Sequence, residues 1–163
     1  MLKNEWTPLK QSLDIIIVNW NSDNFLRKCL NAITRSDLSN IELRIIIVDN
    51  GSTDQSLADL PGSLKIELIK NLQNRGFAAA CNQAWKISDA RYLLFMNPDT
   101  EVFKDTLRQA VLFMESHRDV TILGCRHVDQ DGQTVPSCSR FPRFSFYLYK
   151  ILGLTTLFPK IFY

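Results

Sequence analysis

The chain alternates between short β-branched apolar runs and longer segments whose apolar residues recur every three or four positions. The apolar runs predict strands buried in a sheet, and the periodic segments predict amphipathic helices. Strands are predicted at residues 14–18, 43–48, 64–69, 92–96 and 120–125. Helices are predicted at residues 25–33, 76–86 and 104–117. This alternation predicts an α/β domain with a wound, mostly parallel sheet and flanking helices.

Three of the predicted strands end abruptly in polar residues. The polar segments are Asn19–Asn21, Asp49–Ser52 and Asn97–Asp99. Because the carboxyl ends of parallel strands meet at one edge of a sheet, where ligands bind, we expect the three segments to line one crevice. The last segment taken alone is also typical of a turn followed by a helix cap, since Pro98 cannot continue a central strand.

These polar segments offer an aromatic ring and two carboxylates. The Trp20 ring can stack on a base, and Asp49, with Asn50 beside it, can accept hydrogen bonds from a base or a ribose. Asp99 is a hard oxygen ligand that suits Mg²⁺ or Mn²⁺ bridged to phosphate oxygens. The chain lacks both glycine-rich phosphate-binding motifs, so a cation at Asp99 would be the main counter-charge of a nucleoside diphosphate.

Composition narrows the class of protein further. With 163 residues, 45% of them hydrophobic, the chain is long enough for one domain with a sizeable core. A net charge of +2 does not indicate a nucleic-acid partner. The four cysteines form no C-x-x-C pair, so neither a zinc site nor a redox motif is indicated, and a reducing, cytoplasmic setting fits. We expect no signal peptide and no membrane span.

The last part of the chain has a different character. From Phe141 onward, 8 aromatic residues lie in 23 positions, and every charged residue after Asp131 is basic. Three interpretations remain open for this segment: packing on this domain or on further chain, peripheral contact with an anionic membrane surface, and a homodimer contact. The sequence ends on Ile161–Tyr163 without a polar close, so we expect further chain beyond it.

Four motifs occur in order along the chain: Ile15–Asn21, Val48–Asp54, Asn74–Asn82 and Met96–Thr100. Together they resemble the family 2 inverting glycosyltransferases with a GT-A fold, and within these the rhamnosyltransferase-like members. The resemblance implies a GT-A, Rossmann-like sheet that binds a nucleotide sugar. It also implies an extension at residues 1–13, the N-terminal part of a nucleotide-sugar-binding domain at 14–142, and the start of a truncated acceptor-side region at 143–163.

The resemblance also implies roles for single residues. Asp49 would accept from a base N–H or the ribose, and Asp99 would be the metal-binding last position of a D-x-D motif. Asn97 stands where that motif begins with an aspartate; an amide is a poorer cation ligand, so we expect it to hold the ribose or the loop. The implied nucleotide-sugar-binding residues are Val18, Asn19, Trp20, Asp49, Asn50, Arg75, Gly76, Asn82, Asn97 and Asp99.

The implied reaction transfers a sugar, with inversion, from a UDP- or dTDP-sugar to a polysaccharide or lipid-linked acceptor. Such a transfer requires a base for the acceptor hydroxyl and a divalent cation, Mg²⁺ or Mn²⁺, for the leaving diphosphate. We expect the base to lie outside these 163 residues. Asp129 and Asp131, beside Gly132, are more typical of a solvated hairpin turn. The expected location is the cytoplasm, at or near the inner face of the membrane.

Two other functions remain open. A truncated, non-catalytic chain would bind nucleotide or a partner protein without turnover. A flavodoxin-like or receiver-like signalling domain would share the wound sheet, but it would need an acidic cluster after the first strand, where Asn19–Asn21 stand instead.

Overall fold

The computed structural model of the chain describes residues 11–135, 151 and 153. The chain divides into two compact units, Met1–Leu123 and Gly124–Tyr163, and each unit is described by itself. The predicted aromatic segment at 143–163 and most of the predicted extension at 1–13 lie outside the described residues. The divisions proposed at these positions stay predictions.

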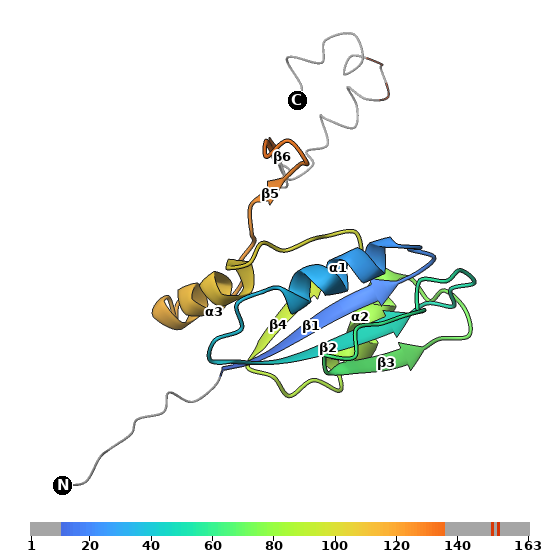
Figure 1. Cartoon of the computed structure of the whole chain (residues 1–163), viewed down its shortest axis with the longest axis horizontal. Helices are drawn as coiled ribbons and strands as arrows, with labels where there is room; N and C mark the ends of the chain where they lie inside the picture. Colours follow the sequence, from blue (N-terminus) through green and yellow to red (C-terminus); the bar gives the residue numbers. More distant parts are fainter. Residues whose placement is uncertain (1–10, 136–150, 152, 154–163) are drawn as a thin grey trace, which may run out of the picture. The chain divides into compact units, whose positions relative to one another are not determined.

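Four parallel strands make up the sheet of the N-terminal unit. They are β1 (Gln11–Asn19), β2 (Ile41–Asp49), β3 (Ile66–Lys70) and β4 (Tyr92–Met96), in the order β3-β2-β1-β4. The β1–β2 ladder ends at the pair Asn19↔Asp49, and the β1–β4 ladder ends at Ile17↔Met96. Because every ladder is parallel, the carboxyl ends of the strands share one edge of the sheet (Figure 1).

Helices cover both faces of this sheet (Figure 1). They are α1 (Phe25–Thr34), α2 (Phe77–Trp85) and α3 (Thr106–Ser116). Ile15 and Ile17 of β1 belong to the core that α1 and α3 complete, whereas Ile16 and Val18 belong to the core beneath α2. Burial on both faces explains the continuous β-branched runs of β1 and β2. The predicted α/β class is confirmed, and both ends of seven predicted elements lie within three residues of the observed bounds.

The helix α2 meets the sheet through small side chains. Ala80, Cys81 and Ala84 are buried against β1 and β2, as expected from the small residues of this segment. The residue before the helix, Gly76, is its N-cap, and its φ of 83° is in the left-handed region that favours glycine. Short contact residues allow the helix axis to approach the sheet closely.

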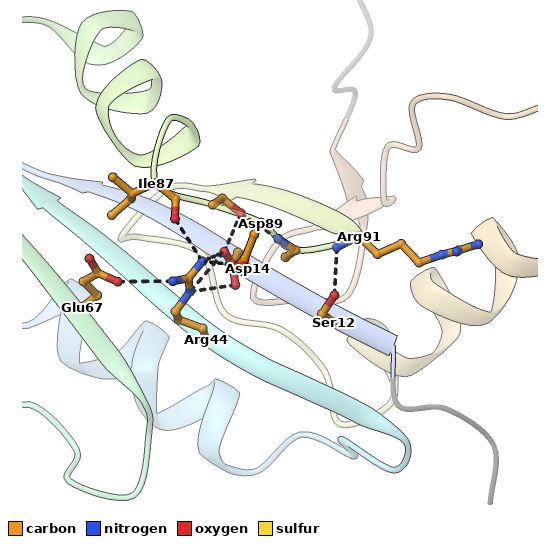
Figure 2. Close-up of polar contacts among 9 residues, drawn as sticks. Ser12, Asp14, Arg44, Glu67, Ile87, Asp89 and Arg91 are labelled. Carbon is orange, nitrogen blue, oxygen red and sulfur yellow. Dashed lines mark hydrogen bonds and ion pairs between the residues drawn. The ribbon is translucent and has the colours of Figure 1, made fainter.

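A cluster of charged residues lies toward the amino-terminal ends of β1 and β2. Figure 2 shows the Arg44 guanidinium between the buried Asp14 and the exposed Glu67 and Asp89. Arg44 Nε donates to Asp14 Oδ1 at 3.1 Å, and Arg44 Nη2 pairs with Asp89 Oδ1 at 3.2 Å. Ser88 Oγ, in the segment after α2, donates to Asp14 Oδ2 at 2.5 Å. The cluster therefore ties the end of α2 to the sheet.

The fifth strand predicted at residues 120–125 is wrong. These residues form no strand, and Ile122 is 87% exposed. An apolar run becomes a strand only where a neighbouring strand satisfies its backbone groups. Within the described residues, β4 pairs with β1 alone, and the run 120–125 forms no ladder with it.

A short antiparallel hairpin follows in the second unit. Its strands are β5 (His127–Val128) and β6 (Thr134–Val135). Asp129 Oδ1 accepts from the backbone N–H of Asp131 at 3.0 Å and of Gln133 at 2.8 Å, and both aspartates are exposed. The carboxylate of Asp129 thus stabilises its own turn, as the hairpin interpretation predicted.

None of the helices in the described ranges has the length and apolar character needed to cross a membrane. The thiols of Cys29, Cys81 and Cys125 are free, and Cys138 lies outside the described residues.

Candidate functional site

The ends of β1, β2 and β4 bring the three predicted polar segments to one edge of the sheet. Asn19 and Asp49 are register partners, and Asn97 follows Met96, which is the register partner of Ile17. The backbone N–H of Asn50 donates to the carbonyl of Asn19 at 2.8 Å, so the β1–β2 ladder continues into the loops. The three segments therefore lie at one edge of the sheet, as predicted.

The Asn19 side chain is fully buried and is the centre of a polar cluster. Its Nδ2 lies 2.8 Å from Asp49 Oδ1, 2.8 Å from Ser56 Oγ and 3.1 Å from Ser52 Oγ. Its Oδ1 accepts from Ser22 Oγ. An amide nitrogen has two hydrogens, so the three acceptors share them. Asn19 thereby holds the start of the β1–α1 loop and the whole 49–56 loop in one arrangement.

Asp49 is 4% exposed, and much of its hydrogen-bonding capacity is used within the protein. Oδ1 accepts from Asn19 Nδ2 and, at 2.5 Å, from Ser52 Oγ; Oδ2 accepts from the Ser52 backbone N–H at 3.1 Å. Each carboxylate oxygen has two lone pairs, so Oδ2 is the atom left with capacity for a donor on a ligand. Most of the hydrogen bonds that the Asp49 carboxylate can accept are therefore used to hold its own loop in place.

Trp20 stands between two anchored residues and is 57% exposed. On one side Asn19 is buried. On the other, the Asn21 backbone N–H donates to Ser52 Oγ at 3.0 Å, and Asn21 Oδ1 accepts from the Thr53 N–H at 2.8 Å. The exposed indole is therefore carried on a backbone that the neighbouring loop fixes from both sides, which is suitable for stacking on a flat ligand.

A further contact joins the same two loops. The backbone N–H of Asp23 donates to Asp54 Oδ2 at 2.7 Å. Burial alone would raise the pKa of Asp54, but hydrogen bonds from the Ser56 hydroxyl and from the backbone N–H groups of Asp23 and Ser56 hold this pKa below its ordinary value. Asp54 is therefore ionised at neutral pH, and its carboxylate holds the two loops together by hydrogen bonds.

The third segment forms the turn that its sequence predicts, since the Thr100 N–H donates to the Asn97 carbonyl at 3.2 Å. The same carbonyl accepts from Cys29 Sγ at 3.9 Å, which connects α1 to this loop. Burial raises the pKa of the Cys29 thiol to about 12, and the negative charges of Glu101 and Asp99 add to the rise. Asp99 itself is exposed, and its carboxylate makes no hydrogen bond or ion pair within residues 11–135.

The donor set at Asp99 is compatible with a shared cation and not with an all-protein cage. No group of three or more His, Cys, Asp or Glu side chains gathers in the described ranges. Magnesium in phosphate-transfer sites is held by one or two carboxylates together with substrate phosphates and water. A single exposed carboxylate at the edge of the crevice fits that arrangement.

The predicted residues of the fourth motif lie in the β3–α2 connection and on α2. Asn50 Nδ2 donates to the Gly76 carbonyl at 3.4 Å, and the Gly76 N–H donates to Asn74 Oδ1 at 2.8 Å. Arg75 and Asn82 are exposed, and no side-chain bond within the described part of the chain ties either to the strand ends. Val18 is buried under α2 and lines the core.

Sequence reasoning missed the groups that organise this edge. They are Ser22, Ser56, Asn71 and Gln83, which act together with Ser52 of the predicted segment. Ser56 and Gln83 act across 37 and 12 positions of sequence, so local pattern gives no sign of their partners. The local sequence does not mark Ser56 either, because it stands between Gln55 and Leu57 in a polar segment.

Comparison with known proteins identifies the family. The model of the family described as "Glycosyl transferase family 2" matches residues 14–163. The chain is similar to poly(ribitol-phosphate) beta-N-acetylglucosaminyltransferase TarS of Staphylococcus aureus, with 28% identity over 128 residues, 75% of this chain and 22% of that protein. It is also 28% identical over 130 residues to a poly(ribitol-phosphate) beta-glucosyltransferase of Bacillus spizizenii, covering 76% of this chain and 20% of the relative.

Solved structures agree with the fold. S. aureus TarS 1–349 in complex with UDP has a TM-score of 0.60 and 25% identity, covering 66% of this chain and 33% of that one. A mannosyltransferase from Pyrobaculum calidifontis in complex with GDP-Man and Mn²⁺ has a TM-score of 0.57 and 23% identity, covering 63% of this chain and 32% of that one. The chain spans about a third of these solved chains, and their likeness places it in the GT-A fold.

The order of strands, the polar strand ends and the family match agree with one another. The rhamnosyltransferase-like branch is not among the matches described above. With the match covering residues 14–163, the chain belongs to glycosyl transferase family 2.

Proposed function

We propose that this chain binds the nucleoside-diphosphate part of a sugar donor, and that the protein transfers the sugar, with inversion, to a polysaccharide or lipid-linked acceptor. The relatives named above act on poly(ribitol phosphate), and one of them is solved with UDP. A UDP- or dTDP-sugar is the proposed donor. A rhamnosyl donor, suggested by the motif resemblance, is one member of that class.

One observation carries this proposal. The loops at the carboxyl ends of the strands expose an aromatic ring and a carboxylate, whereas other polar side chains of these loops hydrogen-bond within the protein. Trp20 is exposed beside the buried Asn19–Asp49 pair, while the Asp99 carboxylate makes no hydrogen bond or ion pair in the described ranges. A ring for the base and a carboxylate for a cation on the diphosphate are the two groups that a nucleotide sugar requires. Asn97 would hold the ribose or the loop beside them.

Asp99 is the residue proposed to hold Mg²⁺ or Mn²⁺. When bound, the cation supplies charge neutralisation for the departing diphosphate. This chain's own contribution is to place one hard oxygen ligand at the open edge of the sheet. Arg75, Gly76 and Asn82 are proposed to line the nucleotide from the β3–α2 side.

The test is a thermal-unfolding titration of the full chain with UDP, dTDP and GDP, each with and without Mn²⁺. We expect UDP or dTDP with Mn²⁺ to raise the melting temperature, because a ligand that binds only the folded state stabilises it. Asp99→Ala should remove the metal-dependent part of this shift. Asp119→Ala, which removes an exposed carboxylate elsewhere, is the matched control. An unchanged melting curve with every nucleotide at millimolar concentration would sink the proposal.

The alternative is a chain that binds nucleotide, or a partner protein through its aromatic segment, without turnover. It is favoured by the described carboxylates, since Asp129 is engaged in its own turn and no base is assigned. Release of UDP from a UDP-sugar, measured with and without acceptor polymer, separates the two functions. The proposed location is the cytoplasm, with contact to the membrane or to a second copy through residues 143–163.

A further inference from the structure

A chain of side-chain amides connects three elements beside the proposed donor site. Asn71, directly after β3, exchanges two hydrogen bonds with Gln83 of α2, each 2.9 Å long. Asn71 Nδ2 also donates to Asn50 Oδ1 at 2.9 Å, and Asn50 Nδ2 reaches the Gly76 carbonyl at 3.4 Å. This series of amides therefore begins at Gln83, two turns inside α2, and ends at Gly76, the N-cap of α2.

The direction of these hydrogen bonds is fixed by one carbonyl. The Gly76 carbonyl can only accept, so Asn50 must turn its Nδ2 toward it and its Oδ1 toward Asn71. Asn71 Nδ2 must then donate, which leaves Asn71 Oδ1 as an acceptor for Gln83 Nε2. Asn50 is 2% exposed, so a wrongly turned amide would leave buried polar atoms unpaired.

The segment enclosed by this amide chain is the β3–α2 loop, residues 71–76. The Asn71 backbone N–H donates to the Asp49 carbonyl at 2.8 Å. At Gly51 a Cβ atom would lie 3.1 Å from Gln73 Cα, so the 49–52 and 71–76 loops touch backbone to backbone. Leu72, Gln73, Asn74 and Arg75 are all exposed. An exposed loop is thus held by its backbone and by amides, with no apolar anchor of its own.

We propose that Gln83 is a positioning residue for the donor site: through Asn71 and Asn50 it fixes the 71–76 loop, and with it Arg75 and the first N–H groups of α2, at the edge of the crevice. This inference rests on the proposed function, because it concerns how the same site binds a nucleotide. Gln83 acts through Asn71 and does not itself touch the ligand.

The experiment compares Gln83→Met and Gln83→Glu with the wild-type full chain. Both variants keep the length of the side chain and remove the Nε2 donor, and Glu also turns a carboxylate toward Asn71 Oδ1. Gln109→Met and Gln109→Glu, at an exposed position of α3, are the matched controls. Two quantities are measured well below the melting temperature: hydrogen exchange of the backbone amides of residues 71–76, and the dissociation constant for UDP with Mn²⁺.

We expect faster exchange in residues 71–76 and binding of UDP weakened about three- to tenfold in both Gln83 variants, which corresponds to the loss of about one hydrogen bond. The Gln109 variants should match wild type. Unchanged exchange in the loop overturns the inference whether or not UDP binds. Faster exchange with unchanged UDP affinity assigns Gln83 a structural role only and also overturns it. Wild-type chain that fails to bind UDP overturns the proposed function itself, and the inference with it.

Discussion

Asp14 and Arg44 form an ion pair across the β1–β2 ladder, at the end of the sheet opposite Asn19 and Asp49. The two residues are register partners, and their side chains are 4% and 19% exposed. Ser88 and the carbonyl of Ile87, both after α2, complete the cluster. The pair therefore joins two strands and the end of a helix, five positions along β1 from the candidate site.

Replacing Arg44 with Met should lower the free energy of unfolding by about 2–4 kcal/mol, because Asp14 stays buried without its cation. Urea unfolding at neutral pH measures this loss. Glu67→Gln is the control: Glu67 is exposed and lies 3.5 Å from Arg44, so its removal should cost less than about 1 kcal/mol. Equal losses in the two variants would contradict the burial argument.

The stability of the protein should fall in acid, and Asp14 contributes to this fall. Burial alone would raise its pKa, but hydrogen bonds from Arg44 and Ser88 hold the pKa below the ordinary value of 3.8. A carboxyl whose pKa is lower in the folded state stabilises the fold above its unfolded pKa, and this contribution disappears as pH falls through the folded pKa. The loss of this stability should therefore begin near pH 3.8 and continue as the pH falls further.

Unfolding curves of wild type and Arg44→Met at several pH values check this prediction. Without Arg44, burial is left as the main influence on Asp14, so its pKa rises and the protonated form is favoured. The difference in stability between the two proteins should be largest at neutral pH and should shrink in acid. A difference that stays constant down to about pH 3 would show that Asp14 ionisation is not involved.

Asn19→Asp should destabilise the candidate site by about 2–4 kcal/mol at neutral pH, since it buries a second carboxylate against Asp49 and removes the Nδ2 donor. The Asn19 Nδ2 and Asp49 Oδ1 atoms are 2.8 Å apart, so the two charges would be adjacent. Thermal unfolding is the measurement. Asn24→Asp is the control, because its Oδ1 accepts from Arg27 at the surface and a carboxylate does so equally well.

Gly51→Ala should cost about 2 kcal/mol, because two penalties coincide there. The φ of Gly51 is +77°, and an added Cβ would lie 3.1 Å from the Gln73 backbone. Gly132→Ala isolates the first penalty, since its φ is +75° with nothing within 4 Å. Gly62→Ala should be close to neutral, because neither penalty applies. Chemical unfolding of all three variants ranks them, and Gly51 should be the most sensitive.

The strands and their shared edge were predictable because burial leaves a direct mark on sequence. The run Ile15–Val18 is apolar throughout because the two faces of β1 are covered by different helices. The strand predicted at 120–125 failed for the complementary reason: its residues are mostly apolar, but the partner strand that would make a ladder is not encoded in the run itself.

The site was only partly predictable. The shared edge follows from the polar strand ends, and Asp99 is exposed there, while its role as a metal ligand stays a prediction. Asp49 was expected to face a ligand, yet it also accepts bonds from Asn19 and Ser52. A carboxylate looks the same in sequence whether it serves a ligand or its own loop, and only the three-dimensional partners distinguish the two.

The small residues on the contact face of α2 limit which substitutions this helix can accept. Ala80, Cys81 and Ala84 keep the helix so near the sheet that Gln83 of α2 reaches Asn71, directly after β3, and Ser88, just after α2, reaches Asp14 of β1. A larger residue at Ala84 would act as a spacer, and neither short polar side chain could span the widened gap. Side-chain volume at this one buried position therefore governs two polar contacts, one at the carboxyl edge of the sheet and one toward its amino-terminal end.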